Sequence, residues 1–257
     1  MTIKAIITNL DSRKAFDVFN ILKSLRIETV KFCSDGWIRC LLFRIAYSRN
    51  VFQNNKASMV EFLIYICNKN QRDKFIYFPI EESAMQQVYR LEGKYPDNLL
   101  FCFPPENSFK LSRNKKLFSN FCVQHNFPIP LEYDYREIDN KGILPNSLIL
   151  KPIIGSGSEG IKYIDSIEQL RALKTLNFKE YIIQEKINQS NPVEAALFLC
   201  QEGVVESYYG HKRIRTSPKE GGVTVFSKCT INKDILEISK SVLKKLNWSG
   251  FAMIEFM

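Results

Sequence analysis

The sequence predicts an α/β domain followed by an α+β domain built on antiparallel sheets. In the first 105 residues, short apolar runs alternate with stretches of helical periodicity, which is typical of a parallel sheet. Beyond residue 105, apolar runs follow one another with short turns between them, which is typical of antiparallel sheet. The 257 residues are enough for two domains with cores that need neither disulfides nor a structural metal.

The first domain is expected over residues 1–105. Its first strand is an Ile-rich run followed by the polar turn NLDSR, and the next helix carries apolar residues at helical spacing. The expected strands are 3–8, 28–33, 74–80 and 98–103, and the expected helices are 13–25, 38–47, 58–69 and 82–93.

A connector region is expected over residues 106–130. The segment PPENS at 104–108 breaks the preceding pattern, and PIP at 128–130 stops the next one, because proline ends a helix. The sequence predicts one helix between them, over 112–126.

The remaining residues, 131–257, form the second domain, with a first subdomain over about 131–187 and a second over 188–257. The strands expected here are 147–153, 161–165, 181–187, 193–200, 203–210, 222–231 and 250–257, and the helices are 166–176 and 232–246.

Composition limits the function classes. Thirty-six basic and 27 acidic residues give a net charge of +9, which favours anionic partners. No apolar run approaches the length of a membrane span, and no signal-peptide layout is present, so we expect a cytoplasmic protein without a membrane partner. Seven cysteines without a CxxC pair predict free thiols in a reducing compartment, and two histidines argue against a zinc site.

The most informative stretch is KPIIGSGSEGI at 151–161. Its glycines match G-x-G-x-x-G, but a dinucleotide-binding loop must lead into a helix, and this one leads into the expected strand 161–165. A Gly-rich turn between antiparallel strands can instead bring backbone N–H groups close to a phosphate, with Lys151 neutralising its charge. The alternative is an ordinary flexible hairpin beside a surface lysine.

Two further segments narrow this choice. YIIQEKI at 181–187 is an apolar strand that turns polar where it could meet an adenine ring, and Lys115 opens the connector helix. In this order, the motifs resemble the ATP-grasp superfamily, and most closely its carboxylate–amine ligase group. The resemblance covers essentially the whole chain and rests on NKKLFSNFCVQHNFPIP (114–130), LILKPIIGSGSEGI (148–161), YIIQEKI (181–187), HKRIRTSPKEGGVTVFS (211–227) and WSGFAMIEFM (248–257).

The resemblance implies a role for each matching residue. Two lysines would bind ATP phosphates, a loop would cradle them, and a hinge would hold adenine. Basic residues would face the γ-phosphate or substrate carboxylate, and one carboxylate would bind magnesium. The implied residues are Lys115 and Lys151 (phosphates), Ser156, Gly157 and Ser158 (loop), Glu185, Lys186 and Ile187 (hinge), Glu194 (ribose), Arg213 and Arg215 (catalysis) and Glu255 (magnesium).

The implied activity joins a small carboxylate to an amine. ATP phosphorylates the carboxylate, releasing ADP, and the amine then attacks the acyl phosphate and displaces inorganic phosphate. This chemistry needs charge neutralisation and positioning by lysine, arginine and magnesium. The family continues past the strand at 250–257 with a Glu-x-Asn-type motif, whereas this sequence stops two residues after Glu255. We therefore expect an ATP-grasp domain that is incomplete at its C-terminus, with little turnover and self-association through 250–257.

Other interpretations stay open at this point. The chain could bind nucleotide without turnover, or use its +9 charge to bind nucleic acid, although no recognisable nucleic-acid module is present. Lys115 could be a helix-surface charge and Glu255 part of a structural salt bridge. Arg213 and Arg215 lie two residues apart on a strand, so they are expected to point to one side, which could be a solvated face.

Overall fold

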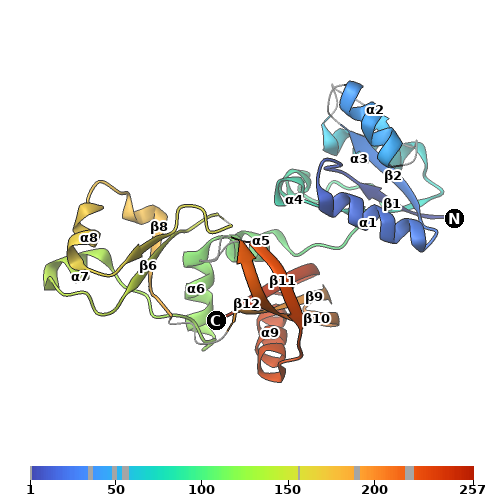
Figure 1. The fold of residues 1–257 in the computed structure, drawn as a ribbon. Coiled ribbons are helices and arrows are strands. Elements are labelled where there is room, and N and C mark those ends of the chain that lie inside the picture. Colours follow the sequence, from blue (N-terminus) through green and yellow to red (C-terminus); the bar gives the residue numbers. More distant parts are fainter. Residues whose placement is uncertain are drawn as a thin grey trace. The chain divides into compact units, whose positions relative to one another are not determined.

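The computed structural model describes residues 2–33, 37–47, 51–53, 58–155, 157–187, 192–217 and 223–257 (Figure 1). The chain divides into two compact units, Met1–Phe103 and Pro104–Met257. No helix in the described part of the chain is long and apolar enough to cross a membrane.

The first unit contains a parallel five-stranded sheet in the order β3-β2-β1-β4-β5, which confirms the predicted α/β class. All four predicted strands are present. The three-residue strand β3 was not predicted, because so short a run carries no periodicity. The strands are β1 (Ile3–Ile7), β2 (Glu28–Cys33), β3 (Val51–Gln53), β4 (Lys74–Phe78) and β5 (Leu99–Phe101).

Two helices cover each face of this sheet. Helices α1 (Arg13–Ser24) and α2 (Trp37–Ala46) pack on the face that carries Ala5 and Ile7. Helices α3 (Met59–Lys69) and α4 (Glu82–Tyr89) pack on the opposite face. The alternation of β1 sends Ile6 to one core and Ala5 and Ile7 to the other, which is why three consecutive residues are apolar.

The second unit opens with two helices, α5 (Glu106–Arg113) and α6 (Lys115–Gln124), so the prediction of a single helix over 112–126 is wrong. The reason is Asn114, whose backbone is extended and whose side chain accepts hydrogen bonds from the N–H groups of Lys116 and Leu117. An asparagine in this role begins a new helix.

A three-stranded antiparallel sheet in the order β7-β6-β8 follows, which we call the lid sheet. Its core lies between the sheet and helices α7 and α8, around the buried side chains of Leu148, Leu150 and Leu170. Helix α7 was not predicted. The elements are α7 (Tyr135–Lys141), β6 (Leu148–Pro152), β7 (Lys162–Ile164), α8 (Ile167–Ala172), the 3₁₀ turn η1 (Phe178–Glu180) and β8 (Tyr181–Glu185).

The last sheet is antiparallel in the order β11-β10-β9-β12, which confirms the predicted α+β class. One face packs against α9 through Ala196, Phe198 and Val242. The other face carries Ala195, Leu197 and their cross-strand partners, and we call it the open face. The elements are β9 (Glu194–Gln201), β10 (Val204–Ser217), β11 (Val223–Cys229), α9 (Lys233–Lys245) and β12 (Gly250–Phe256).

Candidate functional site

Two lysines converge at the lid sheet. Lys115, in the first turn of α6, donates from Nζ to the backbone oxygens of Pro152 and Gly155, both at 2.9 Å. Its backbone N–H also donates to Ile153 O at 2.8 Å, so both ends of the residue are fixed to segment 152–155. Lys151, on β6, donates from Nζ to Gln184 Oε1 at 3.2 Å. Among the described residues, neither ammonium contacts a carboxylate.

The electrostatics of this pair favour an anion. Burial lowers the pKa of Lys115, and burial together with the nearby Lys115 charge lowers the pKa of Lys151. Lowered pKa values mean that the two positive charges are poorly compensated by the protein. A phosphate placed between them would supply the missing negative charge.

The Gly-rich loop lies directly beside Lys115. The backbones of Gly155, Gly157 and Ser158 have positive φ values of 142°, 67° and 62°. Residues other than glycine rarely adopt positive φ. A Cβ added at Gly155 or Gly157 would meet no atom within 4 Å, so the space above the loop is open. That open space fits a loop whose backbone approaches a ligand. Ser156, which the sequence also assigned to this loop, lies outside the described residues.

The residues assigned to the adenine hinge, 185–187, lie at the carboxyl end of β8 in the lid sheet. The Glu185 carboxylate accepts a hydrogen bond from Leu131 N at 2.8 Å, and Lys186 Nζ lies 5.3 Å from the Tyr163 ring centroid. Ile187 is 37% exposed. Gln184, the first polar residue of the stretch that the sequence predicts to meet adenine, links this strand to Lys151. The strand register places Gln184 beside Ile149, on the side of the sheet that Lys151 occupies.

The open face of the second sheet carries Arg213 and Glu255. Their side chains form an ion pair. Glu255 is paired in register with Ala195, which in turn pairs with His211, so the small Ala195 lies between Glu255 and His211. Arg213 Nε and His211 Nδ1 are buried and have no hydrogen-bond partner among the described residues. Polar atoms left in this state can be satisfied by a ligand.

The expectation that Arg213 and Arg215 point to one side is wrong. Arg213 pairs in register with Ser227 and Arg215 pairs with Phe226, because a bulge shifts the register between them. Ser227 and Phe226 are neighbours on β11 and therefore face opposite sides, so the two arginines do as well. Arg215 stacks its guanidinium on the Phe226 ring, 5.5 Å from the centroid.

Glu194 lies on the side of the sheet that faces α9, away from Arg213 and Glu255. It pairs in register with Lys212, forms an ion pair with that lysine at 3.0 Å, and accepts a hydrogen bond from Asn232 at 3.3 Å. Asn232 is the N-cap of α9, which fixes Glu194 to the packed face. The structure therefore does not bring Glu194 together with Arg213 or Glu255.

The residues described do not by themselves form a magnesium site. No group of three His, Cys, Asp or Glu side chains that could hold a metal occurs within the described ranges. Glu255 is one carboxylate and it is engaged by Arg213. Magnesium bound here would depend on phosphate oxygens and water for its other ligands.

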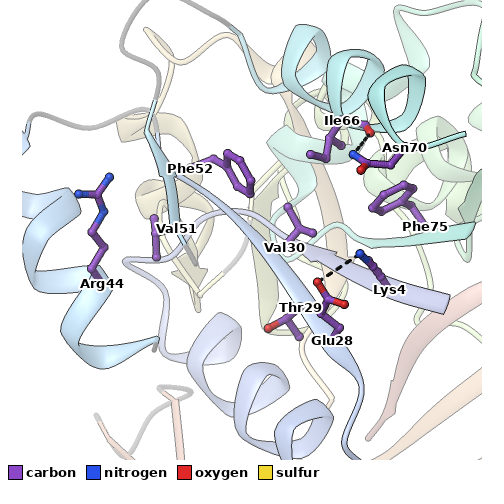
Figure 2. Close-up of a pocket in the computed structure, with 10 residues that line it drawn as sticks. All are labelled: Lys4, Glu28, Thr29, Val30, Arg44, Val51, Phe52, Ile66, Asn70 and Phe75. Atoms are coloured by element: carbon purple, nitrogen blue, oxygen red, sulfur yellow. Dashed lines mark hydrogen bonds and ion pairs between the residues drawn. The ribbon is translucent and has the colours of Figure 1, made fainter. Parts of the chain in front are cut away.

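A pocket of about 590 Å³ in the first unit is a poor alternative site for phosphate (Figure 2). It lies at the amino ends of β1 and β2, whereas ligands of parallel α/β sheets bind outside the carboxyl ends. Its Lys4 is already neutralised by Glu28 at 3.3 Å and Asp73 at 3.0 Å. Arg44 lines the opposite side of the pocket (Figure 2).

Solved structures share this fold. The chain matches Rhizobium etli pyruvate carboxylase with a TM-score of 0.70 and 15% identity. It matches the biotin carboxylase domain of Hydrogenobacter thermophilus 2-oxoglutarate carboxylase, in complex with MgADP, ADP and bicarbonate, with a TM-score of 0.68 and 14% identity. It also matches N5-carboxyaminoimidazole ribonucleotide synthetase from Thermus thermophilus, with a TM-score of 0.64 and 14% identity. The ATP-grasp fold implied by the motifs is thereby confirmed.

These matches cover different shares of the two chains. They include 99%, 98% and 100% of this chain, but 25%, 60% and 67% of the three solved chains. The chain thus spans a quarter of the first structure and about three-fifths of the second. No protein-family model matches the sequence, and no curated protein sequence is significantly similar to it.

Proposed function

We propose that the chain binds ATP at the lid sheet and serves an ATP-dependent ligase that joins a carboxylate to an amine. The observation that carries the proposal is the pair of partly buried lysines, Lys115 and Lys151, which contact no carboxylate in the described part of the chain. They lie beside a loop with open space above Gly155 and Gly157. In this proposal they bind the phosphates together with backbone N–H groups of the loop around Gly157 and Ser158.

Adenine would lie at the end of β8. Backbone groups of Glu185, Lys186 and Ile187 are the candidates, since this strand leads directly from Gln184 beside Lys151. Ile187 would contribute an apolar surface. Glu194 is a weaker candidate for the ribose, because its carboxylate is engaged by Lys212 and Asn232.

Arg213 would meet the γ-phosphate or the substrate carboxylate. It already binds a carboxylate within the chain, that of Glu255, and its Nε is unsatisfied. A carboxylate substrate could take the place of Glu255 and release that side chain. Arg215 points to the other face of its hairpin, so a role at the same substrate atom is not proposed for it.

The ligase proposal is tested by product formation. The chain, with ATP and magnesium, is incubated with pools of amino acids, small carboxylates and dipeptides, with hydroxylamine added to trap an acyl phosphate. Carboxylate-dependent release of ADP together with hydroxamate supports the ligase. ATP binding without either product, across all pools, would contradict it.

A nucleotide-binding protein without turnover is the second candidate. The observation that favours it is the Arg213–Glu255 ion pair, which occupies the one carboxylate assigned to magnesium. Glu255→Gln separates the two candidates. It abolishes product formation if Glu255 assists the metal, and it leaves nucleotide affinity unchanged if the pair is only structural.

A further inference from the structure

Helix α2 has an apolar outer surface. Ile38, Leu41, Leu42 and Ile45 are 60%, 51%, 58% and 75% exposed, although all four are large aliphatic residues. Their spacing is i, i+3, i+4 and i+7, which places them along one stripe of the helix. At about 100° per residue, the stripe covers an arc of roughly 120° or less.

The opposite side of α2 is apolar as well. Cys40 and Tyr47, which follows the helix, are buried in the core between α1, α2 and the sheet, and Phe43 packs against that core. A helix with apolar residues on two opposite sides is typical of one covered on both of those sides. The inner side is covered by the sheet, so the outer side requires a second apolar environment.

Cations flank this stripe. Arg39 and Arg44 each lie roughly 60° beyond one edge of the stripe, and α2 contains no acidic residue. Arg44 also lines the pocket drawn in Figure 2. Long cationic side chains at the margins of an apolar stripe can extend toward anionic groups while the stripe is buried.

Helix α1 has exposed apolar side chains, but they do not continue this stripe. Phe16, Ile21 and Leu25 are 40%, 59% and 63% exposed. The two helices pack together on one face of the sheet, with the Phe16 and Tyr47 rings 5.5 Å apart. At about 100° per residue, Ile21 and Leu25 lie roughly 140° and 180° around α1 from Phe16, on the flank away from α2. The α2 outer face is therefore the stripe made of Ile38, Leu41, Leu42 and Ile45.

The other helical layer provides an internal comparison. Within the described part of α3 and α4, Tyr65 is the only large hydrophobic residue that is exposed. These two helices carry Glu61, Lys69 and Glu82. The charged residues of α1 and α2 are instead mostly basic: Arg13, Lys14, Lys23, Arg39 and Arg44, with Asp17 as the one acid. The two faces of one sheet thus differ in both hydrophobicity and charge.

We propose that the α2 outer face binds an anionic lipid surface. Aliphatic side chains can enter the boundary between headgroups and acyl chains, and flanking arginines can meet anionic headgroups. A second copy of the chain fits less well, because pairing α2 with itself would oppose cations with cations without any acid on the helix. The sequence argued against a membrane partner by the absence of a membrane span and of a signal-peptide layout, and binding to a membrane surface needs neither.

The test is co-sedimentation of the full chain with vesicles of phosphatidylcholine alone or with one-third phosphatidylglycerol. Binding to the anionic vesicles should be at least tenfold tighter, and should weaken strongly between 0.1 and 0.5 M salt. The double variant Leu42→Gln/Ile45→Gln should lose binding by about tenfold or more. The control is Val123→Gln, at a 64% exposed position of α6, which should bind as the parent does.

Three outcomes would overturn the proposal. One is absence of binding to either vesicle, and another is equal binding by the double variant, with circular dichroism confirming that it is folded. The third is a dimer by light scattering that the double variant converts to monomer while vesicle binding is absent, because a second copy would then cover this face.

Discussion

Replacing Lys151 with methionine removes one charge from the proposed phosphate site and keeps most of the side-chain volume. Lys151 Nζ has one hydrogen bond in the described structure, to Gln184 Oε1 at 3.2 Å. A hydrogen bond to a charged group contributes about 1.5–3 kcal/mol. Nucleotide affinity should therefore fall by roughly ten- to a hundredfold, at about 1.4 kcal/mol per factor of ten.

The same substitution should change stability little. The lowered pKa of Lys151 shows that its charged form is disfavoured in the folded protein, so removing the charge relieves a cost. Removing the amine also leaves Gln184, a buried side chain, without that partner. These effects oppose each other, and we expect the unfolding midpoint to move by no more than about 4 °C.

The assay is calorimetric titration of Lys151→Met with ADP and with ATP plus magnesium. The matched control is Lys110→Met, since Lys110 is an exposed lysine of α5 that pairs with Glu106 four residues earlier. Lys110→Met should bind nucleotide as the parent does. Unchanged affinity in Lys151→Met, or an equal loss in both variants, would refute the reasoning.

Three further predictions concern the two lysines of the site, the Gly-rich loop and the buried Lys31. The pKa values of Lys115 and Lys151 are lowered from the ordinary lysine value of 10.5, and only the ammonium form binds phosphate, so nucleotide affinity should decrease as pH rises through these pKa values. Fluorescence titration from pH 7 to 10 checks this, and an affinity that does not change with pH contradicts it. Amide exchange at 157–160 should be fast without ligand and slower with ATP; strong protection in the empty protein would indicate a rigid hairpin instead. Lys31 is buried and its pKa is lowered by burial, so the folded protein binds fewer protons at this residue than the unfolded chain does. The free energy of unfolding should therefore rise as pH becomes alkaline. Urea denaturation of Lys31→Met should show a smaller rise than the parent.

The sequence predicts elements well where one physical signal dominates. Most residues of β1, β4 and β5 in the first sheet are apolar, and β6 and β8 each contain a run of three apolar residues. Helix α7 escaped because it buries one residue, Ile138, and so has no apolar stripe. Its caps were readable all the same: Asp134 precedes it with Glu137 three residues later, and Gly142 ends it at a φ of 65°.

Features that depend on how strands pair in register cannot be predicted from a single sequence. A two-residue spacing predicts that Arg213 and Arg215 share a face, but a bulge between them reverses this. The contact of Lys151 with Gln184 depends on how β6 pairs with β8, 33 residues away. Helix periodicity likewise continues through Asn114, although its side chain caps a new helix there.

Photoaffinity labelling with 2-azido-ATP tests the central claim most directly, because it reports where the nucleotide base lies. Labelled protein is digested and the modified peptide is identified by mass spectrometry, with unlabelled ATP as competitor. The account predicts a competed adduct within 182–187, at the end of β8 beside the two lysines, and its loss in Lys151→Met. A competed adduct confined to the unit Met1–Phe103, or labelling that ATP does not displace, would contradict it.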